Sequence, residues 1–233
     1  MKNRQRLHIC LIILSCCFPA AAQDDGYLME LGLGGGGCFY MGDANNRLYN
    51  NTNGVFSVLA RYNVNPRFSL KADFAAAGIS GDTNDAFGVI PGDGLRFSRT
   101  VYDAGVQVEW GFCGYGMEGW NGCHRIAPYG LIGLGLTYAP KPVNNDFAAN
   151  FPIGLGIRYK ISDRVNIGLE WTMRFSTSDR LDVTRTMPDT QLENPFTIKG
   201  KGIKNKDSYS FTMLYVTFDV FKRPCNCNDE TTM

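Results

Sequence analysis

The chain has 233 residues, which fits one domain of ordinary size. It contains 27 glycines and 12% aromatic residues, and only 19% of its residues are charged, against about a quarter in an average protein. This composition suits a β-protein, and the formal net charge of +1 excludes the strongly basic surface that nucleic-acid binding requires.

Residues 1–22 have the pattern of a secretory signal peptide. A basic start, an apolar stretch and a small-residue cleavage site follow one another: Lys2, Arg4 and Arg6, then Leu7 to Phe18, then Ala20 to Ala22. The apolar stretch is shorter than the roughly 20 residues of a membrane-spanning helix. Without this segment, 20 Lys and Arg stand against 22 Asp and Glu, a net charge of −2. An uncleaved anchor and lipoprotein processing at Cys16 or Cys17 remain as alternatives.

Alternation of apolar and polar residues with a period of two predicts eight β-strands in the rest of the chain. The four most regular segments are 68–76, 102–112, 151–161 and 165–175, and weaker alternation occurs at 27–40, 55–64, 129–138 and 209–221. Most of these segments have ten residues or more. A tilted membrane-spanning strand needs about 9–11 residues, so the lengths favour a membrane barrel.

The predicted connections alternate between short and long. Tight turns are expected at 63–67 and 162–164, and longer polar links at 42–53, 80–99, 140–150 and 177–207; the link at 113–125 has intermediate length. Bacterial outer-membrane barrels have short periplasmic turns and long outer loops. The sequence therefore predicts an all-β protein: an eight-stranded antiparallel transmembrane β-barrel over residues 23–221, with residues 222–233 as a periplasmic C-terminal tail.

Either face of such strands could point outward, because a soluble barrel that binds lipid places its apolar side chains inside. Three features favour apolar side chains facing a membrane: glycines on the polar face, charges of both signs on that face, and aromatic residues near strand ends. We expect the charged residues to form a structural polar network in a filled lumen. Its predicted members are Lys71, Asp73, Asp103, Glu109, Arg158, Lys160, Glu170 and Arg174.

Five cysteines remain after removal of the signal peptide: Cys38, Cys113, Cys123, Cys225 and Cys227. The last four are expected at the oxidising periplasmic side, where a disulfide between Cys113 and Cys123 would close the one long inner link. Cys225 and Cys227 could pair with each other or contact a periplasmic partner. A zinc site from the four periplasmic cysteines and His124 is conceivable, although the spacing matches no standard ligand pattern.

No catalytic residue, cofactor or resident metal is predicted. His124 is the one histidine of the mature chain, and it falls in the inner link, away from the outer loops where a histidine-assisted hydrolase of small barrels would act. The glycine run at 32–37 lacks the following lysine and helix of a phosphate-binding loop, so it is interpreted as a flexible or close-packed part of a strand.

Several segments resemble one family of outer-membrane barrels. They are 34–45 (GGGGCFYMGDAN), 60–63, 65–68 and 204–221 (KNKDSYSFTMLYVTFDVF), with an aromatic-x-Gly-Asp group at Tyr40 to Asp43 and Asn-Lys-Asp at 205–207. This family contains PorG, a component of the type IX (Por) secretion system. The resemblance implies a non-enzymatic barrel in the outer membrane that contacts periplasmic secretion proteins through its inner turns and its tail.

Two other functions remain open. One is an outer-surface adhesion or defence barrel that uses the loop at 177–207, where six basic residues outnumber the acids: Arg180, Arg185, Lys199, Lys201, Lys204 and Lys206. The other is a lipid-modifying enzyme, which the scarcity of histidine disfavours. The expected location for the leading function is the cell outer membrane, with membrane lipid as a partner and no nucleic acid.

Overall fold

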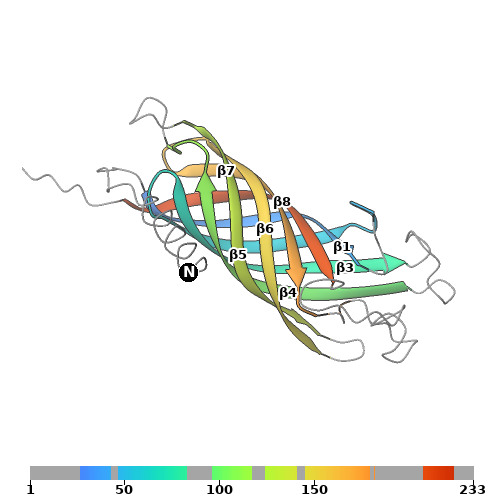
Figure 1. The fold of residues 1–233 in the computed structure, drawn as a ribbon. Helices are drawn as coiled ribbons and strands as arrows, with labels where there is room; N and C mark the ends of the chain where they lie inside the picture. The colour runs from blue at the N-terminus through green and yellow to red at the C-terminus, as the bar shows by residue number, and fades with distance from the viewer. Residues whose placement is uncertain are drawn as a thin grey trace, which may run out of the picture.

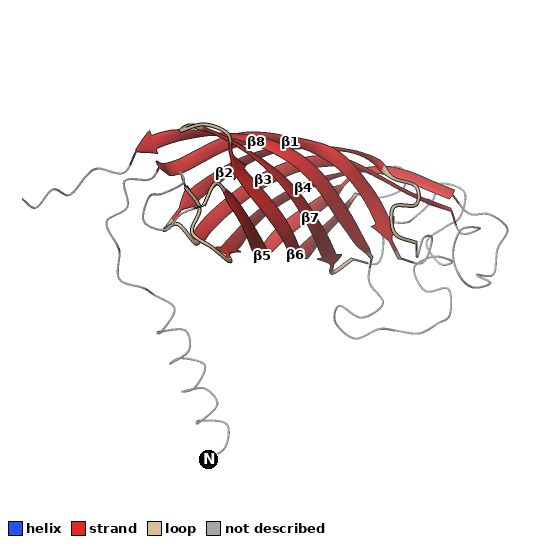
Figure 2. Cartoon of the chain, turned by 90° about the horizontal axis from the view of Figure 1, so that it is seen from above, coloured by secondary structure: helices blue, strands red, loops and turns tan. Residues whose placement is uncertain are grey.

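A computed structural model describes residues 27–42, 47–82, 96–116, 124–140, 145–178, 181 and 207–222. Eight strands lie in these ranges: β1 (Tyr27–Met41), β2 (Asn53–Asn63), β3 (Phe68–Asp82), β4 (Arg96–Gly111), β5 (Ile126–Ala139), β6 (Asp146–Lys160), β7 (Val165–Ser176) and β8 (Ser208–Lys222). Each strand pairs antiparallel with the next along the chain, and β8 pairs with β1 (Figures 1 and 2). The prediction of a closed, eight-stranded antiparallel barrel is confirmed.

The barrel has two different ends. We call the end with the β2–β3, β4–β5 and β6–β7 connections the turn end, and the end with the other four connections the loop end. β1 starts and β8 finishes at the turn end, on the left of Figure 1. Among the residues that the structure describes, no helix is long and apolar enough to cross a bilayer.

β3 and β4 are longer than the sequence pattern predicts. β3 continues to Asp82 and β4 begins at Arg96, so the predicted link at 80–99 is wrong in its length. β6 likewise begins at Asp146, within the link predicted at 140–150. The β3–β4 pairing runs without a break from Phe68 opposite Trp110 to Asp82 opposite Arg96. The paired strands therefore extend beyond the point at which the apolar pattern stops.

The outer surface of the barrel is apolar and its interior carries charge. Exposed apolar side chains occur on every strand, such as Leu33 at 57% exposure, Leu134 at 66% and Leu155 at 57%. Arg61, Glu109 and other charged residues are fully buried inside. This distribution is the reverse of that in a soluble barrel with an apolar cavity, and it agrees with the expected orientation of the two strand faces.

Several predictions fall on residues outside the described ranges. The signal peptide, its cleavage site and the C-terminal tail beyond Lys222 belong to this group, as do Cys123, Cys225 and Cys227. They stay predictions from sequence.

Candidate functional site

The inward positions of six strands place a cluster of ionised side chains in the half of the barrel nearer the turn end. We call it the central cluster, and it comprises Glu30, Arg61, Lys71, Glu109, Arg158 and Glu170. Arg61 connects two carboxylates: its Nη1 lies 2.6 Å from Oε2 of Glu30, and its Nε lies 2.8 Å from Oε2 of Glu109. Lys71 then connects Glu109 at 3.5 Å with Glu170 at 2.5 Å. The cluster thus ties β1, β2, β3, β4 and β7 together through the lumen.

Arg158 completes the central cluster from β6. Its Nη1 lies 3.7 Å from Glu109 and 4.0 Å from Glu30, beyond hydrogen-bond distance, so the attraction is between charges alone. Its guanidinium lies between the rings of Tyr115 and Tyr129, at 4.8 Å and 5.0 Å from their centroids. Cation–π attraction therefore replaces part of the hydration that burial removes.

A second cluster lies on the loop side of the first, around Arg174. Its Nη2 lies 2.7 Å from Oδ2 of Asp73, and its Nη1 donates to Asp103. Asp103 also accepts hydrogen bonds from Asn150 at 2.7 Å and from the hydroxyl of Tyr209. A buried charge is tolerated only when it is paired and hydrogen-bonded, and both carboxylates here meet that condition.

Tyrosine rings fill the space that the inward glycines leave. Tyr129 pairs in register with Gly156, and Tyr215 pairs with Gly168. A Cβ atom on either glycine would overlap the ring opposite. The two hydroxyls lie 3.0 Å apart, and that of Tyr129 also donates to Glu170 at 2.7 Å. Gly156 and Gly168 are therefore the partners of large side chains in a crowded lumen.

The connection between β4 and β5 closes the turn end. Tyr115 lies in this connection, and its hydroxyl donates to Oδ1 of Asn166 at 2.7 Å. Its ring also faces Lys160, which forms an ion pair with Asp219 at 2.7 Å. Burial raises the pKa of the Tyr115 hydroxyl above its usual range, so this group stays a neutral donor. The β4–β5 connection thus supplies a side chain that covers the lumen at the turn end.

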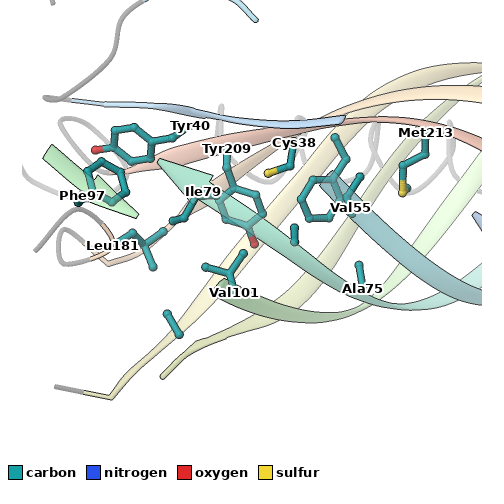
Figure 3. Close-up of a cluster of buried hydrophobic side chains, with 13 residues drawn as sticks. Cys38, Tyr40, Val55, Ala75, Ile79, Phe97, Val101, Leu181, Tyr209 and Met213 are labelled. Carbon is teal, nitrogen blue, oxygen red and sulfur yellow. The ribbon is translucent and has the colours of Figure 1, made fainter. Parts of the chain in front are cut away.

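The loop end is closed mainly by apolar side chains, beside the buried charged residues Arg99 and Asp207. A buried apolar cluster fills the lumen there, and Figure 3 shows it. Its members are Cys38, Tyr40, Val55, Ala75, Ala77, Ile79, Phe97, Val101, Ala139, Leu181, Tyr209, Phe211 and Met213. Leu181 comes from the connection between β7 and β8, and it is only 1% exposed. A residue of the connection therefore packs into the mouth of the barrel.

The structure places all eight predicted lumen residues in the interior. Lys71, Glu109, Arg158 and Glu170 belong to the central cluster; Asp73, Asp103 and Arg174 lie together on its loop side; Lys160 lies near the turn end. The sequence reasoning missed Glu30, Arg61 and Asp219, which occupy inward positions on the weaker strands and could have been found there. It also missed Tyr115 and the apolar cluster.

The cysteine predictions are only partly within the described residues. Cys113 lies in the β4–β5 connection, with its Sγ 3.6 Å from the carbonyl oxygen of Ile126. Its predicted partner Cys123 lies outside the described ranges, so the disulfide stays a prediction. Cys38 is buried in the apolar cluster. Within the described ranges, no three His, Cys, Asp or Glu side chains are grouped as metal ligands.

Comparison with known proteins gives one family match. A family model described as a domain of unknown function (DUF6089) matches residues 5–229. The chain belongs to this family. A search of curated proteins gives no match.

The solved structures similar to this chain include a β-barrel domain and a surface protein. The chain is similar to the N-terminal β-barrel domain of Pseudomonas aeruginosa OprF, with 10% identity, coverage of 84% of this chain and 98% of that one, and a TM-score of 0.45. It is similar to Neisserial surface protein A, with 10% identity, 82% and 97% coverage, and a TM-score of 0.48. It is also similar to Ail, the attachment invasion locus protein of Yersinia pestis, with 12% identity, 83% and 98% coverage, and a TM-score of 0.46.

Proposed function

We propose that the protein spans the outer membrane as a closed barrel and serves there as a non-enzymatic anchor for periplasmic proteins. The observation that carries this proposal is the combination of an apolar outer wall with a lumen that is filled along its length. A barrel of this kind offers neither a wide diffusion path nor a substrate pocket in its interior, so its two ends and its wall are left as working surfaces.

The dimensions of the apolar wall support the membrane location. Exposed aromatic side chains lie near both edges of the apolar wall, such as Tyr102 and Trp110 on β4 and Phe147 and Tyr159 on β6. At ~3.4 Å per residue these pairs are separated by about 27 Å and 41 Å along their strands. A strand tilt of ~40° reduces the separations to about 21 Å and 31 Å along the barrel axis, which bracket the ~25 Å apolar band of outer-membrane barrels.

The turn end supports the role of an anchor. If the barrel has the usual orientation, with its short turns inside, this end faces the periplasm. Exposed basic side chains occur on three of its connections, Arg67, His124 and Arg164, and Asp163 lies beside the last of these. A partner with an acidic surface would be complementary to this rim.

The link with type IX secretion comes from the resemblance to the family that contains PorG. Two of the segments that carry the resemblance meet in the fold, because the hydroxyl of Tyr40 donates to the carboxylate of Asp207. The motifs are therefore parts of one structural contact, which supports treating the resemblance as one of architecture as well as of sequence. The tail with Cys225 and Cys227 is proposed as a further contact with periplasmic secretion proteins.

Deletion of the gene tests this function, with secretion of type IX cargo as the measurement. We expect cargo to accumulate in the periplasm and secretion to be restored by the wild-type chain. A chain with both Arg67→Glu and Arg164→Glu should reach the membrane and fail to restore secretion, whereas Arg47→Glu at the loop end should restore it. Unchanged secretion after deletion would exclude this role.

A second function is favoured by the shape of the loop end. β3 and β4 run beyond the apolar wall as a paired hairpin, which would project from the cell surface. An adhesion or defence role would use this hairpin and the connection at 177–207. It predicts that a chain shortened in these connections assembles normally but no longer supports surface binding, while cargo secretion is unaffected.

A further inference from the structure

The outer wall of β3 and β4 changes from apolar to polar toward the loop end. A row of four stacked or tilted rings, Phe74, Tyr102, Tyr138 and Phe147, crosses β3 to β6 with centroids 6.4 to 6.5 Å apart. Beyond this row the outward positions are polar apart from Gly78: Thr100, Ser98 and Arg96 on β4, and Ser80 and the largely buried Asp82 on β3. Ser98 lies four residues past Tyr102, about 14 Å along the strand, at the height of lipid head groups.

These polar residues surround a hollow of about 580 Å³, lined by Asn51, Ser80, Gly81, Asp82, Arg96, Phe97 and Ser98. The edge of the hollow is held in place, because Asn53 donates to Oγ of Ser80 at 2.7 Å and to the carbonyl oxygen of Asn51 at 2.9 Å. Asn51 has a φ of 51°, a left-handed conformation that these hydrogen bonds help to maintain.

The hollow offers one exposed cation to an anionic group, although that cation is paired with a carboxylate. Arg96 Nε lies 2.5 Å from Asp82, yet the arginine side chain is 77% exposed and that of the aspartate only 13%. The guanidinium is therefore the charged group that a ligand meets, and its planar fork suits a phosphate. Serine hydroxyls and the amide-bearing loop residues nearby are suited to the hydroxyls of a sugar.

A second hollow lies on the same wall, closer to the middle of the barrel. It has a volume of about 600 Å³ and a mostly apolar lining: Leu31, Gly32, Leu33, Val58, Leu59, Ala60, Ala72, Asp73 and Phe74. Two small residues, Ala60 and Ala72, pair in register at the base of this hollow, and their short side chains leave it open. Leu31, Leu33, Val58 and Phe74 stand around it as exposed apolar side chains. An acyl chain is the natural occupant of an apolar notch in a lipid-facing wall.

The spacing of the two hollows matches one amphiphile. β3 lines both, with Phe74 in the apolar notch and Ser80 in the polar hollow. Six residues cover about 20 Å along a strand, or about 15 Å along the axis at a tilt of ~40°. This span runs from the apolar wall at the aromatic row to the polar positions beyond it, so one lipid molecule can reach both hollows. We propose that this wall binds an acylated phosphosugar of the outer leaflet, its head group in the polar hollow and an acyl chain in the notch; the proposal rests on the outer-membrane location proposed above.

Native mass spectrometry tests the proposal on the full mature chain. The chain is refolded into phosphatidylethanolamine vesicles that contain diphosphoryl lipid A or, in a parallel sample, phosphatidylglycerol, and is then released into detergent. We expect the wild type to retain one lipid A and to retain phosphatidylglycerol at least tenfold less. The pair Arg96→Ala with Ser98→Ala should lower lipid A retention about tenfold, and so should Ala72→Phe, which fills the notch. Ser162→Ala and Ala149→Phe, an exposed serine and an exposed alanine elsewhere, are the controls.

The outcomes separate this inference from the function on which it rests. Equal retention by the wild type and the two hollow variants, or equal retention of lipid A and phosphatidylglycerol, overturns the proposed site. In a further sample, soluble glucosamine bisphosphate competes with lipid A. If it suppresses lipid A retention while Ala72→Phe leaves that retention unchanged, the protein has a head-group site alone, and the part of the proposal assigned to the notch is overturned. The heat-induced mobility shift of a folded membrane barrel on gels is recorded for every sample, and its absence in the wild type would refute the membrane location itself.

Discussion

The hydroxyl of Tyr40 donates a hydrogen bond to the carboxylate of Asp207, although 167 residues separate the two in sequence. The other carboxylate oxygen of Asp207 accepts the backbone N–H of Leu181 at 2.9 Å. One aspartate thus connects the end of β1, the start of β8 and the connection that enters the apolar cluster. A Cβ atom on Gly42 would overlap the Tyr40 hydroxyl, which explains why glycine follows two residues after the tyrosine.

Tyr40→Phe should lower the free energy of unfolding by about 1.5–3 kcal/mol, because it removes a buried hydrogen bond to a charged group. The measurement is urea unfolding of the barrel in vesicles, followed by tryptophan fluorescence. Tyr138→Phe is the control, since that side chain is exposed on the outer wall, and it should change stability by less than about 0.5 kcal/mol. Equal effects of the two substitutions would contradict the role assigned to the Tyr40 contact.

Gly168→Ala should destabilise the barrel by about 1–3 kcal/mol, because the new methyl group overlaps the ring of Tyr215 and forces it to move. Gly35→Ala is the matched control: Gly35 is exposed, and the nearest atom to its Cβ position, the carbonyl oxygen of Val55, is at an ordinary contact distance of 3.7 Å. The same unfolding measurement compares them. A Gly168 variant as stable as the Gly35 variant would show that the ring has room to shift.

The strands and their faces were predictable because one physical rule governs most of their length. Phe68 to Ala76 alternates without a break: each outward residue lies on the apolar wall, and the inward residues as far as Asp73 lie in the polar lumen. The rule fails beyond Ala76, where the polarity of the two faces reverses: Ala77 and Ile79 point inward into the apolar cluster, and Ser80 points outward. The alternation continues there with apolar residues inward and polar residues outward. The sequence pattern therefore predicted a loop where the strand continues.

The side chains of the lumen could be predicted from the sequence where they are charged, and could not be predicted elsewhere. Lys71, Glu109 and Glu170 could be assigned to one network because they interrupt apolar strands at inward positions. Tyr115 could not, because the position of its ring over Arg158 depends on the path of an irregular connection that no periodicity describes. A reversal of face polarity along a strand is the signal that would have revealed the apolar closure.

Glu109→Ala should cause the largest loss of stability among single substitutions in the lumen, about 3–5 kcal/mol. It removes the carboxylate that faces Arg61 at 2.8 Å, Lys71 at 3.5 Å and Arg158 at 3.7 Å, and it leaves three buried cations with less compensation. Glu109→Gln should fall between Glu109→Ala and the wild type. Asp163→Ala, at an exposed turn position, serves as the charge-removal control. A loss below about 1 kcal/mol for Glu109→Ala would mean that the cluster rearranges freely.

The purified protein should give no long-lived conductance steps in planar bilayers. The central cluster, the Arg174 cluster and the apolar cluster fill successive levels of the lumen, and Tyr115 covers the turn end. A wide porin prepared in the same detergent provides the positive control. Stable steps from the wild-type barrel would contradict a filled interior.

Brominated lipids should quench the two tryptophans of the barrel wall to different extents. Trp171 lies in the middle of β7 on the outer wall, and Trp110 lies near the turn end, stacked on Phe68 with centroids 6.3 Å apart. In a Trp120→Phe background, single-tryptophan chains are refolded into vesicles with bromine near the bilayer centre or near the head groups. Central bromine should quench Trp171 more strongly, and shallow bromine should quench Trp110 more strongly, because aromatic residues near strand ends lie at the membrane interface. Aqueous iodide provides the opposite test: efficient quenching of Trp171 by iodide, with no effect of bromine at either depth, would place the apolar wall in water and remove the basis for a membrane-spanning barrel.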